Sequence, residues 1–185
     1  MTRNFAPPLA ASLWLISLPC FANVLPNGYE IIGNYAVAVD AEAIESQSYY
    51  SAGGDFSDLT FNESFGIKTY HVSGSVNDDI PLLEVVLQEG SVVGELSIVN
   101  VTFIDQDYDT ALAAAYLETA GVALESYGAI MDETIEMGAD GAISFAFIAD
   151  FIRIDLDTDT PITGETGARV EVRFSGTFPA NELSE

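Results

Sequence analysis

The chain contains a single cysteine, Cys20, which lies in an apolar segment close to the N-terminus. No cysteine follows it, so no disulfide and no thiolate metal site can form in the body of the protein. The body therefore has to be held together by packing alone. Apolar residues make up 49% of the 185 residues, which is enough for a hydrophobic core, and the length is that of one domain.

The first 22 residues have the features of a secretory signal peptide. Arg3 supplies a basic start, residues 9–18 form an apolar run, and Cys20 and Ala22 place small residues before a cleavage point. The run is shorter than the roughly 20 residues that span a membrane. We therefore predict an exported protein, periplasmic or extracellular, whose mature chain begins at Asn23. Lipidation of Cys20 is an alternative, although the residues before it match a lipobox poorly.

The charge balance is strongly acidic, with 29 Asp and Glu residues against 5 Lys and Arg, giving a formal net charge of -24. A surface of this sign repels the phosphates of nucleic acids and the headgroups of anionic membranes, so neither is an expected partner. Cations, cationic surfaces, neutral ligands and other proteins remain. Charged residues are nonetheless only 18% of the chain, which argues against intrinsic disorder.

Apolar patterning divides the mature chain into two predicted parts. Residues 23–79 are rich in aromatic and turn-forming residues and predict a β-rich N-terminal extension. Short strands are expected there at residues 29–32 and 35–39, and one or two helical turns within residues 40–48. The second part, residues 80–180, is predicted to contain strands at residues 82–88, 91–104, 142–156 and 168–178. Residues 181–185 form a C-terminal tail.

One long helix is predicted within the second part, from about Thr110 to Met137. Apolar residues at steps of three or four fall on one helical face, at Leu117, Ala120, Leu124, Tyr127, Met131 and Ile135. Asp109 or Thr110 is a candidate N-cap, and Gly138 is a candidate C-cap. The predicted fold class is therefore α+β: a β-α-β-β layer in which the helix covers one face of an antiparallel sheet.

Three segments of this second part resemble the YbjQ family. They are residues 89–95 (EGSVVGE) before the predicted helix, residues 137–145 (MGADGAISF) after it, and residues 170–178 (VEVRFSGTF) in the last strand. The resemblance covers about residues 80–180. It implies a dodecin-like β-α-β-β subunit that assembles into a homo-oligomeric ring, typically a pentamer. The family is often labelled as heavy-metal binding, without an agreed activity.

Two acidic runs are candidate cation sites, residues 105–109 (DQDYD) and residues 155–159 (DLDTD). Carboxylates at alternate positions of an extended chain face the same way and can converge on a hard cation such as calcium. Neither run has the spacing of an EF-hand loop, so a solvated acidic loop is the competing interpretation. The second run is preferred because Glu165 follows it. The metal-site hypothesis names Asp155, Asp157, Asp159 and Glu165.

The sequence contains no recognisable set of catalytic residues. His71 is the only histidine, and neither a nucleophile elbow nor a phosphate-binding glycine motif occurs. We therefore predict no enzymatic activity and no cofactor other than calcium at the acidic loop. Several aromatic residues are candidates either for a core or for a carbohydrate or protein contact: Tyr49, Tyr50, Phe56, Phe61, Phe65 and Tyr70.

These features predict an exported, non-enzymatic YbjQ-like domain that acts as an oligomeric or protein-binding module. The alternative is a protein that binds divalent cations through its acidic loops. A hydrolase has less support, because the sequence places neither a nucleophile nor a general base.

Overall fold

The computed structural model describes residues 28–183 except for 40–41, 52, 54–55, 75–81, 91–94, 105–109, 116–117, 120–121, 124–127, 156, 159, 163, 166 and 181. The strands are β1 (Tyr29–Val39), β2 (Glu42–Ser51), β3 (Leu59–Ser64), β4 (Ile67–Gly74), β5 (Leu82–Glu89), β6 (Leu96–Ile104), β7 (Thr110–Ala115), β8 (Glu118–Thr119), β9 (Val122–Ala123), β10 (Ala129–Met137), β11 (Ala142–Asp150), β12 (Ile152–Asp155), β13 (Thr160–Pro161) and β14 (Arg169–Thr177). The described residues contain no helix, and so none that is able to cross a membrane. The α+β prediction is therefore wrong, because the described part of the chain is all-β.

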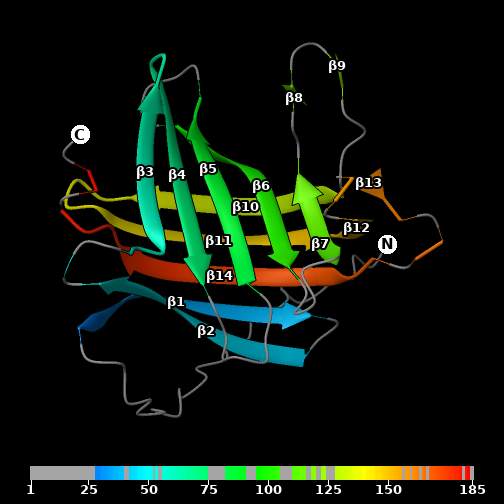
Figure 1. Cartoon of the computed structure of the whole chain (residues 1–185), viewed down its shortest axis with the longest axis horizontal. Coiled ribbons are helices and arrows are strands. Elements are labelled where there is room, and N and C mark those ends of the chain that lie inside the picture. The colour runs from blue at the N-terminus through cyan, green and yellow to red at the C-terminus, as the bar shows by residue number, and fades with distance from the viewer. Residues whose placement is uncertain are drawn as a thin grey trace, which may run out of the picture.

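The strands form two antiparallel sheets and one small hairpin, β8–β9. The five-stranded sheet has the order β10-β11-β14-β1-β2, and the seven-stranded sheet has the order β13-β12-β7-β6-β5-β4-β3. Figure 1 shows β3 to β7 crossing the strands of the other sheet at a steep angle, as in orthogonal sheet packing. Both sheets combine strands from before residue 75 with strands from after residue 81.

Alternation of apolar and polar residues explains which faces form the interior. In β11 and β14 every second side chain is buried, and the positions between them in β14 carry Arg169, Glu171 and Arg173. A period of two places all the apolar side chains of a strand on one face. The strands predicted at residues 82–88 and 168–178 are confirmed as β5 and β14, whereas the strand predicted at 142–156 divides into β11 and β12 at Phe151.

The core between the sheets is rich in aromatic rings. Phe145, Phe174 and Tyr35 lie opposite one another on β11, β14 and β1, with centroid distances of 5.1 Å and 4.5 Å between successive rings. The Phe174 ring lies over Gly33 and Gly176, where a Cβ would collide with it. The Tyr35 hydroxyl donates to the Val72 carbonyl oxygen of β4 (2.9 Å), so this one side chain connects both sheets.

Specific residues close the corners of the sandwich. The chain passes from β11 in one sheet to β12 in the other at Phe151, which is buried. Between β2 and β3, the Tyr49 N–H donates to Asp58 Oδ2 (2.7 Å) and the Asp58 N–H donates to the Tyr49 carbonyl oxygen (2.9 Å). At edge strand β10, Glu133 Oε2 accepts from the Ile98 N–H of β6 (3.3 Å). These contacts tie edge strand β2 to the start of β3 and edge strand β10 to β6, which limits the pairing of these edges with other chains.

Among the residues predicted as one helix, those that the structure describes form β7, the β8–β9 pair and β10. Strand β10 resembles a helical repeat because it contains a bulge: Met131 pairs with Ile148, but Thr134 pairs with Ala146. Asp132, inside the bulge, has a φ of 52°, which an α-helix excludes. The predicted helical face also included residues 117, 120, 124 and 127, which lie outside the described residues.

The alanines of residues 111–114 belong to strand β7, which is buried on both faces. Leu112 and Ala114 of β7 belong to the core between the sheets, whereas Ala111 and Ala113 pack with Ile154 in a second cluster. Small side chains allow close packing in a sheet as well as in a helix, so they do not distinguish the two. The helical turns expected within residues 40–48 are likewise replaced by strand β2. The β-α-β-β subunit implied by the family resemblance is thus not the fold of the chain.

Candidate functional site

A pocket opens at the end of the five-stranded sheet, where β1 extends beyond β14. Strand β1 pairs with β14 only from Gly33 to Val39, so residues 29–31 pair with β2 alone and Ile32 lies in a bulge between the two stretches. After Thr177 the chain leaves β14, because Phe178 is buried in the core and its N–H donates to the Gly141 carbonyl oxygen (3.0 Å). The diverging segments leave an open pocket of about 380 Å³.

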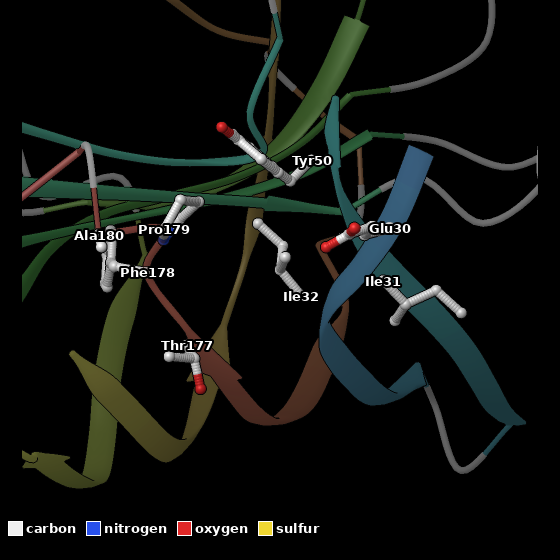
Figure 2. A pocket seen from close by; sticks show the side chains of 8 residues that line it. All are labelled: Glu30, Ile31, Ile32, Tyr50, Thr177, Phe178, Pro179 and Ala180. Carbon is white, nitrogen blue, oxygen red and sulfur yellow. The ribbon is translucent and has the colours of Figure 1, made fainter. Parts of the chain in front are cut away.

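The pocket is lined by apolar and polar residues, and its exposed surface is polar and apolar in similar amounts. Its lining residues are Glu30, Ile31, Ile32, Tyr50, Thr177, Phe178, Pro179 and Ala180. Figure 2 shows the Glu30 carboxylate and the Ile32 side chain on the side of β1 that faces the C-terminal segment, whereas Ile31 points away. The volume lies at the small end of the range for ligand pockets, about 300–1,000 Å³. A pocket of this size fits one large side chain or a comparably small ligand.

Exposed apolar side chains adjoin the pocket on the other side of β1. Tyr29, Ile31 and Phe56 are 40%, 43% and 46% exposed, and we call these three residues the apolar rim. The Tyr29 and Phe56 rings meet at a centroid distance of 6.2 Å. They meet because Tyr29 pairs with Ser51, whose N–H donates to the Phe56 carbonyl oxygen (2.9 Å). Large apolar side chains gathered at one exposed site are typical of interaction surfaces.

Glu30 gives the pocket its charge. It is the only charged residue among the described residues that line the pocket. The net charge of the chain, -24, adds a negative field around the site. The matching ligand chemistry is therefore an apolar group next to a cation.

The aromatic residues singled out in the sequence separate into two groups. Tyr70 is buried and packs against Phe61 at a centroid distance of 5.0 Å, as expected for a core. Phe56 and Phe65 are exposed, which leaves them available for contact. Sequence patterning did not single out the pocket residues Glu30 and Ile32. They are found only from the strand register, which shows that β14 stops pairing with β1 at Gly33 and leaves the first residues of β1 uncovered.

His71 lies on β4, on the outer face of the seven-stranded sheet. Its Nδ1 is 3.2 Å from Oε1 of Glu84, and both side chains are partly exposed. A carboxylate only accepts, so the pair orients the imidazole with its proton on Nδ1. The hydrogen bond from His71 holds the pKa of Glu84 below its usual value. Within the described residues, no group of three His, Cys, Asp or Glu side chains is placed to hold a metal ion.

The structure gives the predicted calcium ligands separate roles. Asp155 Oδ1 accepts from the Thr158 N–H (2.8 Å) and from the Thr158 hydroxyl (2.9 Å), and these bonds lower the pKa of Asp155. Asp157 is exposed in the adjoining turn. Glu165 accepts from Arg153 Nε (3.1 Å). Asp159 and the whole first acidic run, residues 105–109, lie outside the described residues.

Calcium and sodium chloride should separate a cation site from general screening. Sodium chloride should raise the melting temperature, because it screens the self-repulsion of a chain with charge -24. A site at the second acidic loop predicts that millimolar calcium adds a further rise at equal ionic strength, and that Asp157→Asn removes this rise. The contacts of Asp155 and Glu165 favour the result without an additional rise. An equal calcium effect in wild type and mutant would assign the effect to diffuse charge.

Comparison of the chain with models of protein families, with curated proteins and with solved structures finds no match.

Proposed function

We propose that the chain is an exported protein-binding module whose pocket takes an apolar side chain with a cation beside it. The observation that carries this proposal is the position of the pocket next to the apolar rim, at one end of the sandwich. Binding sites are commonly concave and mainly apolar, with a few polar groups that set specificity. Glu30 is the charged group here, beside the hydroxyl-bearing residues Tyr50 and Thr177, and an extended peptide of a partner protein supplies both parts of the matching ligand.

The fold supports this proposal because it places the site on regular structure. Ile32 is the extra residue of the bulge in β1, while Tyr50 pairs with Glu30 on the adjoining strand. The C-terminal wall is anchored by Phe178, which is buried against Tyr70 with a centroid distance of 5.6 Å. A wall fixed on both sides loses little conformational freedom on binding, which favours affinity. The excess of negative charge selects cationic partners and speeds their encounter.

Short peptide amides test the pocket directly. N-acetyl-Phe-Lys-amide should shift the amide resonances of residues 30–32, 177, 178 and 180 in an NMR titration, with weak affinity in the millimolar range. The same peptide with Ser in place of Phe should shift them far less, because the apolar contact carries the binding. Glu30→Gln should weaken binding of the Lys peptide by about two- to fivefold, the usual effect of one exposed charge pair.

A pocket-filling variant gives the matched control. Ala180→Trp adds a large side chain to an exposed position in the pocket wall, so it should abolish the shifts. Ala43→Trp adds the same side chain at an exposed position on β2 outside the pocket and should leave them unchanged. Binding that persists in Ala180→Trp, or that does not distinguish Phe from Ser, would refute the pocket as the binding site.

A further inference from the structure

The turn between β3 and β4 carries a strained and exposed aromatic residue. Phe65 has a φ of 55° and is fully exposed, at 103%, and Gly66 follows it with a φ of 78°. Two successive residues with positive φ are typical of a type I′ hairpin turn, whose first position favours Asn, Asp or Gly. A bulky side chain there is uncommon and costs conformational energy. The ring of Phe65 recovers none of this cost within one molecule, because its surface is uncovered.

A cation follows the same turn on β4. At the top of Figure 1 the β3–β4 turn stands clear of the sheet. Ile67 on β4 is 46% exposed, and Lys68 is the only lysine in the sequence. Lys68 Nζ lies 3.2 Å from Oε2 of Glu89, and its side chain remains 38% exposed. The turn therefore carries an exposed aromatic ring and is followed by a partly exposed cation, which lies on the face of β4 opposite to that of Ile67.

We propose that Phe65 of one copy inserts into the pocket of a second copy, so that the protein associates head to tail. This inference rests on the proposed function of the pocket and names a second copy as its partner. The pocket beside Ile32 receives the ring, and Lys68 comes close to Glu30 of the second copy. The exposed aromatic and the pocket are then two halves of one contact. A contact between two different surfaces repeats from copy to copy, and it forms a ring if the rotation closes and a filament if it does not.

The net charge sets the salt dependence of this association. Two copies with a formal charge of -24 each repel one another at low ionic strength. The Debye length falls from roughly 20 Å to roughly 6 Å between about 0.02 M and about 0.3 M salt. Salt weakens the single attraction between Lys68 and Glu30, but it weakens the repulsion between the many acidic residues more. Association should therefore increase as the salt concentration rises over this range.

Sedimentation velocity of the purified mature chain at rising concentration tests the proposal. Wild type should form oligomers in about 0.3 M sodium chloride, and both Phe65→Asn and Ala180→Trp should be monomeric. Phe65→Asn should also melt at a higher temperature than the wild-type monomer, because Asn-Gly suits this turn. This gain shows that the variant folds, so a loss of oligomers cannot be attributed to misfolding.

Mixing the two variants provides the decisive experiment. Phe65→Asn keeps an open pocket and Ala180→Trp keeps the aromatic turn, so their equimolar mixture should form a one-to-one dimer that neither forms alone. Oligomers of Phe65→Asn alone, or a mixture that stays monomeric, would overturn the head-to-tail contact. A wild type that stays monomeric while N-acetyl-Phe-Lys-amide still binds overturns this inference alone. A wild type that neither associates nor binds the peptide overturns the proposed function as well.

Discussion

Replacing Tyr35 with alanine should lower the free energy of unfolding by about 3–5 kcal/mol, the usual cost of deleting a large buried aromatic side chain. Tyr35 is 2% exposed and touches rings on two neighbouring strands, Phe174 and Phe145, at centroid distances of 4.5 Å and 6.0 Å. Its loss therefore opens a cavity at the centre of the sandwich. Denaturant titration followed by circular dichroism measures the change.

Two further variants separate the contribution of the Tyr35 hydroxyl from that of its buried ring. Tyr35→Phe keeps the ring but removes the hydroxyl that donates to the Val72 carbonyl oxygen, so it should cost about 1–2 kcal/mol. Tyr29→Ala removes the same type of side chain from the same strand at an exposed position and should change stability by less than about 1 kcal/mol. A Tyr35→Ala variant as stable as Tyr29→Ala would contradict the two-sheet core.

Strands with strict alternation were predictable from the sequence, and β10 was not. In β14 the alternation of Val170, Val172 and Phe174 with polar residues has a single interpretation, and the strand forms as predicted. In β10, Ile130 and Ile135 both pack against the core although they are five residues apart, because the bulge at Asp132 shifts the register. A bulge makes a strand appear aperiodic in the sequence, and nearby steps of three and four then favour a helix.

The candidate site was less accessible to sequence reasoning than the fold. The pocket depends on where β14 stops pairing with β1 and on the path of Pro179 and Ala180 afterwards, and both are set by contacts between distant residues. Local patterning carries no information about such contacts. Phe56 and Phe65 were among the aromatic candidates, but only the structure separates them from Phe61 and Tyr70, which pack against the core.

Asp58 is a buried carboxyl group that the sequence did not single out. It lies at the corner between β2 and β3 with 6% exposure, and burial raises its pKa from 3.8 to about 6 despite the hydrogen bond from the Tyr49 N–H. The protonated form is therefore favoured by folding, so the folded state binds this proton more tightly than the unfolded state. Its contribution to stability is fully present below about pH 3.8 and is lost as the pH rises through about 6.

Asp58→Asn should remove this loss, because the amide oxygen still accepts from the Tyr49 N–H and carries no charge. Between pH 4 and pH 8 the wild type should lose about 1–3 kcal/mol more stability than the variant, an upper range set by roughly 1.4 kcal/mol per unit of pKa shift. Glu84, whose pKa is lowered, acts in the opposite direction, but it is present in both proteins and cancels in the comparison.

Removing any acidic residue also relieves the general repulsion of a chain with charge -24, so the comparison needs a surface control. Glu171→Gln removes one charge from an exposed position of β14 and measures that general effect. Denaturant midpoints of wild type, Asp58→Asn and Glu171→Gln at half-unit steps of pH give three curves. The curve of Asp58→Asn should diverge from that of the wild type mainly between pH 4 and pH 6.5, whereas that of Glu171→Gln should stay nearly parallel to it. Parallel curves for all three proteins would mean that Asp58 ionises without cost, and hence that water reaches the corner between β2 and β3.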